Sequence, residues 1–178
     1  MHRRFSSKSA GLSLVEGLLV LVSTFIVLSI IQREVVESRD RAARLNIEES
    51  VRNGDAAQVK RGLKTRIFVD MSVYEPWTDA EGKETILQSS LLSLAVKLQH
   101  PSVVDVLLEE GANVDGQVWG NARQPIFWAA YNSDAEMYDK LVGAGTDLSA
   151  LVEGKTALAH TSAGHEGAAK FFEARGAE

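Results

Sequence analysis

Few side chains in this chain are spaced for acid–base, nucleophilic or metal chemistry. The four histidines are His2, His100, His160 and His165, and no pair of them has zinc-site spacing with a third ligand behind it. Gly143-Ala144-Gly145 lies at an expected helix end without the strand–helix context of a phosphate loop. No serine lies in a nucleophile-elbow pattern, and the absence of cysteine excludes disulfides and thiolate ligands. The sequence predicts no catalytic residue, metal ligand, cofactor or small-molecule substrate, and hence no enzyme.

Binding chemistry is better represented, by aromatic side chains in the stretches that connect expected helices and by Tyr131 on an expected helix. Exposed aromatic residues are enriched at the energetic centres of protein interfaces. Packing of the same rings onto neighbouring helices is the alternative, and for Trp128 we expect burial in the core. The residues predicted to bind a partner are Tyr74, Trp77, Trp119, Arg123 and Tyr131.

The elements that position these residues come from one unit repeated along the C-terminal half. Copies begin at Ser90, Gln124 and Thr156, 34 and then 32 residues apart. Each contains two short apolar stretches with helical spacing and ends on a glycine, as at Gly111 and Gly145. A period of this length is typical of a stacked solenoid, in which no unit buries its apolar face alone.

This part of the chain resembles an ankyrin-repeat protein. The copy with Gly154-Lys155-Thr156-Ala157-Leu158 and Gly164-His165-Glu166 is closest to the family pattern, whereas the other copies have Gln99-His100 and Ser133-Asp134 in place of Gly-His. Asn53-Gly54-Asp55 marks a degenerate earlier unit. The resemblance implies an all-α solenoid of about four units over roughly residues 43–178, with the domain placed at 45–178. It also implies that His100 and His165 tie backbone segments together, and that the solenoid binds another protein.

An insertion separates the degenerate unit from the next one and lengthens their spacing to 45 residues. Alternating apolar residues at 67–73 predict a strand, and Pro76 to Gly82 predict a turn. The sequence therefore predicts an enlarged β-hairpin at about 65–86, which in ankyrin-like proteins is a finger that contacts partners.

Charge is distributed unevenly along the chain. Residues 1–69 contain twelve Lys/Arg and seven Asp/Glu, whereas residues 70–178 contain seven Lys/Arg and seventeen Asp/Glu. An acidic solenoid is a poor partner for nucleic acid, because phosphate binding depends on clustered basic residues. The balance favours a protein partner with a basic surface; the alternative is that the acidic residues only maintain solubility.

The N-terminal region predicts a membrane helix. Residues 12–32 follow a basic leader at 1–11, are mostly apolar with Glu16 as their one charged residue, and precede an expected helical linker at 33–44. Twenty such residues span about 30 Å as a helix, the thickness of a bilayer's hydrocarbon core. A cleaved secretory signal is the alternative. The counts of positive charge on the two sides do not select an orientation.

The segment Gly11-Leu12-Ser13-Leu14-Val15-Glu16 resembles the processing site of type IV pilins and pseudopilins. The resemblance implies cleavage after Gly11, a methylated amino terminus at Leu12, and Glu16 as the intramembrane carboxylate that pairs with a neighbouring chain. The sequence departs from the family in its leucine at position 12 and in its repeat-containing body. The alternative is an ordinary anchor helix with Glu16 close to the headgroups.

These features together predict a membrane-anchored interaction module. The expected location is the inner membrane of a bacterium, single-pass, with the repeats in the periplasm. One specific version is an immunity or inhibitor protein that masks an envelope-acting toxin. The alternatives are a pilin-like subunit of a pilus or secretion filament and an adaptor that faces the cytosol.

Overall fold

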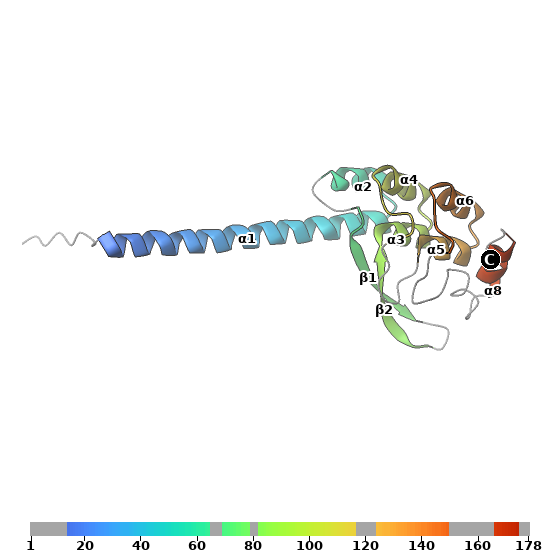
Figure 1. Ribbon diagram of the computed structural model, residues 1–178, viewed down its shortest axis with the longest axis horizontal. Helices are drawn as coiled ribbons and strands as arrows, with labels where there is room; N and C mark the ends of the chain where they lie inside the picture. Colours follow the sequence, from blue (N-terminus) through green and yellow to red (C-terminus); the bar gives the residue numbers. More distant parts are fainter. Residues whose placement is uncertain (1–13, 65–68, 79–81, 117–123, 150–165, 175–178) are drawn as a thin grey trace, which may run out of the picture. The chain divides into compact units, whose positions relative to one another are not determined.

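The computed structural model describes residues 14–64, 69–78, 82–116, 124–149 and 166–174 (Figure 1). The chain divides into two units, 1–42 and 43–178. The elements in chain order are α1 (Leu14–Arg52), α2 (Ala56–Leu63), β1 (Ser72–Thr78), β2 (Glu84–Ser90), α3 (Leu91–Lys97), α4 (Pro101–Glu109), α5 (Pro125–Tyr131), α6 (Ala135–Gly143) and α8 (Glu166–Glu173).

The described part of the first unit is one helix, the N-terminal portion of α1. An 18-residue window of this helix has a mean hydropathy of 2.1, and none of the window is buried. The hydroxyls of Ser23, Thr24 and Ser29 donate to carbonyls one turn earlier, at 2.8–2.9 Å, so these polar groups are satisfied inside the helix. The predicted long apolar helix therefore exists, and its length and composition fit a membrane span or a signal sequence.

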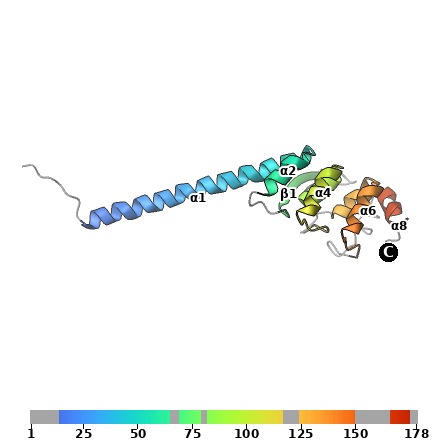
Figure 2. The ribbon, with the colours of Figure 1, turned by 90° about the horizontal axis from the view of Figure 1, so that it is seen from above.

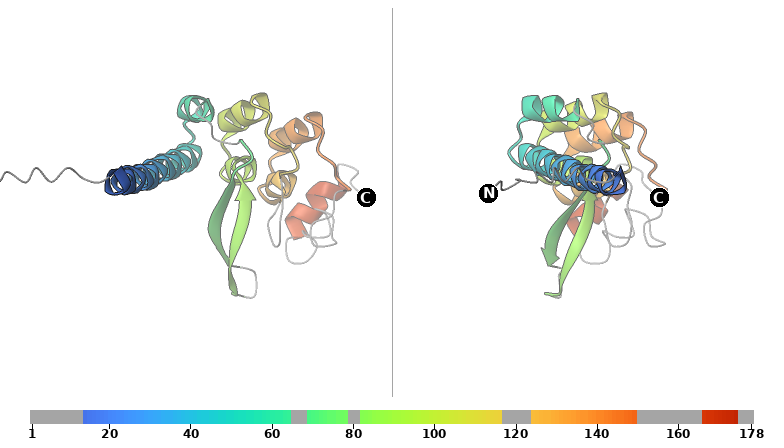
Figure 3. Two further views of the ribbon diagram at one scale, coloured as in Figure 1. Left: turned by 60° about the vertical axis from the view of Figure 1, so that its left-hand side comes forward. Right: turned by 90° about the vertical axis from the view of Figure 1, so that its left-hand side faces the viewer.

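Short antiparallel helix pairs are the main elements in the described part of the second unit. The last turns of α1 pair with α2, α3 pairs with α4, and α5 pairs with α6 (Figures 1 and 3). Seen from above, α2, α4, α6 and α8 follow one another in chain order (Figure 2). The described residues are thus mainly helical, with one small two-stranded sheet.

The turn inside each helix pair has the same backbone geometry. Gly54, Gln99 and Ser133 all have positive φ, of 71°, 57° and 54°. The residue after each one donates its N–H to a carbonyl five residues earlier, at 2.9–3.0 Å, which is the helix-ending arrangement that a left-handed residue permits. Because glycine adopts positive φ without strain, the Gly-His pattern of the ankyrin repeat has a backbone reason, and Gln99 and Ser133 meet the same requirement at a cost.

The second helix of each pair ends as the sequence predicts. Gly111 and Gly145 have φ of 85° and 97°, and the following residues donate to carbonyls five positions back. Successive loops are then joined in register. The Asp70 carboxylate accepts from the Asn113 N–H at 2.8 Å, and the Asp115 carboxylate accepts from the Asp147 N–H at 3.0 Å.

The core lies between the helix pairs and consists of apolar residues that recur every three or four positions along each helix. Leu91, Leu94, Leu107 and Leu141 are fully buried, as is Ala95 where α3 meets its neighbours. Small residues at such positions let paired helices approach closely. The remaining large buried side chains are Ile47, Val51, Val59, Leu87, Leu92, Ile126 and Trp128.

The hairpin is present, but β1 begins later than the sequence predicts. It runs over Ser72–Thr78 and pairs antiparallel with β2, so that Pro76, predicted to begin the turn, lies within the strand opposite Ile86. In a two-stranded sheet each strand has an open edge, and a proline is tolerated there because no ladder hydrogen bond is required on that side. The hairpin extends away from the helix pairs beside α3 (Figure 3).

Candidate protein-binding surface

The two faces of the hairpin differ sharply in exposure. Val73, Glu75, Leu87 and Ser89 are buried on one face. The other face is open to solvent, and we call it the outer hairpin face. By register it consists of Ser72, Tyr74, Pro76, Thr78, Glu84, Ile86 and Gln88. Alternation along both strands produces this division, because successive side chains in a strand point to opposite faces.

Two large apolar side chains are exposed on the outer hairpin face. Tyr74 is 64% exposed and Ile86 is 59% exposed. Tyr74 lies opposite Gln88 and Pro76 lies opposite Ile86, so Tyr74 and Ile86 are diagonal neighbours on one surface. Gln88 donates to the Ser72 hydroxyl at 2.8 Å, which orders the base of this face. The result is a small apolar patch with a polar margin, as in the centre and rim of a protein interface.

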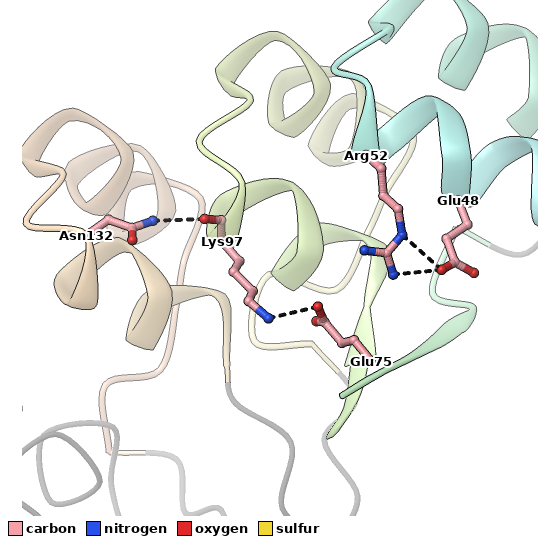
Figure 4. Close-up of polar contacts among 5 residues, drawn as sticks. All are labelled: Glu48, Arg52, Glu75, Lys97 and Asn132. Carbon is pink, nitrogen blue, oxygen red and sulfur yellow. Dashed lines mark hydrogen bonds and ion pairs between the residues drawn. The ribbon is translucent and has the colours of Figure 1, made fainter. Parts of the chain in front are cut away.

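An ion pair holds the hairpin against α3 from its buried side. The Lys97 ammonium lies 2.8 Å from the Glu75 carboxylate, with the two side chains 20% and 7% exposed (Figure 4). The same ammonium lies 4.8 Å from the centroid of the Trp128 ring, a cation–π contact. Within the described residues the second oxygen of Glu75, Oε1, has no hydrogen-bond partner. The pair with Lys97 compensates for part of the cost of burying this carboxylate.

The C-terminal end of α3 is fixed from the opposite direction as well. The Asn132 side-chain amide donates to the Lys97 carbonyl at 3.1 Å (Figure 4). It also donates to the Val96 carbonyl at 3.4 Å. Lys97 therefore connects the hairpin, its own helix pair and the next pair. The contacts of Lys97 with Glu75 and Asn132 hold the hairpin, and with it the outer hairpin face, against the helix pairs.

His100 plays the backbone-tying role expected of it. Its Nε2 lies 3.1 Å from the Arg52 carbonyl, at the end of the preceding helix. Gly54 lies against the ring, where an added Cβ would come within 2.9 Å of Nδ1. The first and second helix pairs are thus joined by an imidazole, as Asn132 joins the second and third.

The predicted binding residues have different placements. Tyr74 lies on the outer hairpin face, and Tyr131, at the end of α5, is 40% exposed and packs against Phe127 and Trp128 with ring centroids 6.1 and 5.6 Å away. Trp128 is 1% exposed, as predicted for a core residue. Trp77 lies in β1 opposite Thr85.

The other predicted site residues are spread along the chain. Trp119, Arg123, Gly11 and Leu12 lie outside the described residues. Glu16 is exposed in the first turn of α1. The structure thus brings Tyr74 together with Ile86 and leaves Tyr131 on a different element.

Sequence reasoning did not find Ile86, Glu75 or Lys97. Ile86 comes after the expected turn, in a segment, 84–90, whose apolar and polar residues do not alternate, so no pattern marked its face. Glu75 and Lys97 lie 22 residues apart, a separation at which no local pattern links two charges.

Among the residues that the structure describes, no group of three His, Asp or Glu side chains could hold a metal ion. The outer helices carry exposed ion pairs between neighbours, Lys60–Glu109 at 3.0 Å and Lys140–Asp105 at 2.6 Å, and such pairs contribute little stability.

Comparison with known families gives one match, to the ankyrin repeat, over residues 88–117. That segment covers the end of β2, all of α3 and α4, and the beginning of the following loop. Comparison with curated proteins finds no match. The ankyrin-repeat match supports a role in protein–protein interaction.

Proposed function

We propose that this protein is a membrane-anchored ankyrin-type module that binds another protein through the outer hairpin face. In this proposal about four units form the solenoid, with the α5–α6 pair and α8 continuing the repeat that the family match identifies. Binding is stoichiometric, and the membrane helix raises the local concentration of the module near its partner.

The observation that carries the proposal is the exposed apolar patch of Tyr74 and Ile86, 64% and 59% accessible on a hairpin whose other face is buried. A hairpin held by the buried ion pair of Glu75 and Lys97 presents these side chains from a backbone that is already ordered. Such preorganisation lowers the entropic cost of association. Tyr131, Trp77, Trp119 and Arg123 remain predicted members of a wider surface.

The partner's chemistry follows from the charge of the repeats. Residues 70–178 carry an excess of ten acidic groups over basic ones, from seventeen Asp/Glu and seven Lys/Arg. A partner with a basic rim around an apolar centre would complement the patch and its acidic surroundings, and the opposite fields would speed encounter.

The anchor specifies where binding takes place. The apolar portion of α1 supports a single-pass membrane location. The pilin-like segment at residues 11–16 is the basis for proposing an inner membrane with the repeats in the periplasm. A small, tethered binding domain suits an immunity or inhibitor protein for an envelope-acting toxin. Cells that overproduce the protein should then survive a toxin secreted by neighbours, and this version is abandoned if overproduction protects against none.

Affinity capture tests the binding surface. The full-length protein, extracted from its membrane in mild detergent, should retain a partner that is lost from Tyr74→Arg and from Ile86→Arg. Val142→Arg is the matched control, because Val142 is a 40% exposed apolar residue on α6. Retention of every captured protein by both hairpin variants would exclude the outer hairpin face as the binding site.

A pilin-like subunit is the second candidate function. The observation that favours it is the uninterrupted helix Leu14–Arg52 with Glu16 in its first turn, where a neighbouring chain's amino terminus could pair with the carboxylate. Mass spectrometry of the purified protein separates the two functions. A chain that begins at Leu12 supports filament assembly, and an intact Met1 end supports a plain anchor.

A further inference from the structure

One face of α1 carries a repeating pattern of apolar and small residues. Between Gln32 and Ala42 most residues are charged, yet Val35, Ser38 and Ala42 are not. Their spacing of three and four residues continues toward the N-terminus without interruption. We call this face the α1 seam, and it consists of Gly17, Leu21, Thr24, Leu28, Ile31, Val35, Ser38 and Ala42.

Alternating steps of four and three residues are the spacing of the contact positions in a two-stranded coiled coil. All of the large members are open to solvent: Leu21 67%, Leu28 60%, Ile31 49% and Val35 42%. Small members such as Gly17 allow two helices to approach closely inside a membrane.

The two hydroxyl-bearing members of the seam need no outside partner. The Thr24 hydroxyl donates to the Leu21 carbonyl and the Ser38 hydroxyl donates to the Val35 carbonyl, each at 2.9 Å. A helix can therefore pack against both positions without burying an unsatisfied donor.

The same spacing extends to an exposed leucine in the part of α1 that belongs to the second unit. Leu45 comes next, and it is 60% exposed although Ile47, Ser50 and Val51 on the same helix are buried in the core. At about 100° per residue, Leu45 lies roughly opposite the centre of that buried face. The packing of the repeats therefore leaves this side of the helix open.

We infer that a second copy of this chain covers the α1 seam, giving a parallel two-stranded homodimer. The charges beside the seam fit this occupant. Glu34 and Arg39 hold the two flanking positions that meet across a parallel pair, so each Glu34 faces the other copy's Arg39. No ion pair within the described residues occupies either group, whereas Arg33 and Glu37, on the side away from the seam, pair with each other within the helix at 2.7 Å.

The parallel arrangement rests on the proposed membrane anchoring, because two copies inserted in the same direction align their helices. The charged stretch after Ile31 covers only about two heptads, which is short for a coiled coil in solution. Insertion in a bilayer adds the apolar half of the seam and confines both copies to one plane, which raises their effective concentration.

Single-cysteine cross-linking of the full-length protein in lipid vesicles tests the inference. The chain has no cysteine of its own, so each introduced thiol reports one position. Val35→Cys should form disulfide-linked dimers on mild oxidation, because identical seam positions meet in a parallel pair. Val36→Cys is the matched control, an adjacent valine that is 55% exposed outside the seam. Equal cross-linking at the two positions, or none at Val35, would overturn the homodimer.

Charge exchange provides a second readout. Glu34→Arg should weaken dimerisation by roughly tenfold, because two attractive pairs become two repulsive ones. Adding Arg39→Glu to the same chain should restore it. If the double variant dimerises no better than Glu34→Arg alone, the pairing across the seam is wrong.

These results are separable from the proposed function. Failure of the homodimer leaves capture of a partner through Tyr74 and Ile86 untouched. Release of the protein from vesicles by alkaline extraction would instead remove the membrane anchoring on which the parallel arrangement rests.

Discussion

Replacing Lys97 by methionine should destabilise the second unit far more than an ordinary surface substitution. Methionine keeps the length of the side chain and its contact with Trp128, but leaves the Glu75 carboxylate, 7% exposed, without its cation. Removing one partner of a buried ion pair costs about 3–5 kcal/mol. Because Lys97 itself is 20% exposed, water can partly solvate the abandoned charge, and we expect a loss of about 2–4 kcal/mol.

The chain offers both a control and a rescue. Lys140→Met removes a lysine from the exposed pair with Asp105, whose side chains are 26% and 52% exposed, and should cost less than about 1 kcal/mol. Combining Lys97→Met with Glu75→Met should recover most of the lost stability, because an apolar pair of similar volume can replace a buried ion pair.

Tryptophan fluorescence during urea denaturation in nonionic detergent measures this effect. All three tryptophans, Trp77, Trp119 and Trp128, lie between residues 43 and 178, so the signal reports the second unit while the apolar part of α1 stays in the micelle. Equal unfolding midpoints for Lys97→Met and Lys140→Met would refute the reasoning. So would a double variant no more stable than Lys97→Met alone.

Three further predictions concern the repeats. Gln99→Gly should stabilise the protein by about 0.5–1 kcal/mol, because φ of 57° strains a residue with a Cβ; an unchanged or lower urea midpoint would count against it. Burial raises the pKa of the Asp115 carboxyl above its ordinary value of 3.8, although an N–H bond from Asp147 opposes this and the charge of Asp147 adds to it. The folded state then holds that proton more tightly than the unfolded state, so the wild-type protein loses stability as pH rises above 3.8. The side-chain amide of the Asp115→Asn variant has no such proton, so the unfolding free energy of this variant relative to wild type should increase from pH 4 to 7 in matched urea titrations. Leu107→Asp places an unpaired charge at a position with no exposure and should unfold the repeats; unchanged circular dichroism and melting would contradict the assigned register.

The sequence was sufficient to predict the helix pairs, because their signals are local. Gly111 and Gly145 mark helix ends by a backbone requirement, and Pro125 begins α5 where a missing N–H is harmless. Gly54 reveals the degenerate unit for the same reason, since its turn needs positive φ.

The hairpin shows where local reasoning fails. The alternation that begins near Val69 continues through Glu75, but an acidic residue on a buried face and a proline beside it make the strand read as a turn. Glu75 can be buried there because it forms an ion pair with Lys97, 22 residues away. A local sequence pattern cannot predict a pairing at that separation. The α1 seam was not predicted for a different reason. Ser38 and Ala42 are small and weakly apolar, so an apolar stripe is not evident among the charged residues of 33–44.

Photo-crosslinking in intact membranes tests the central claim most directly. A photoreactive residue placed singly at Tyr74 and at Ile86 should give one discrete adduct with a different protein. The same residue at Val142, also exposed and apolar, should give none. No adduct from the hairpin, or the same adducts from all three positions, would contradict a partner bound at the outer hairpin face.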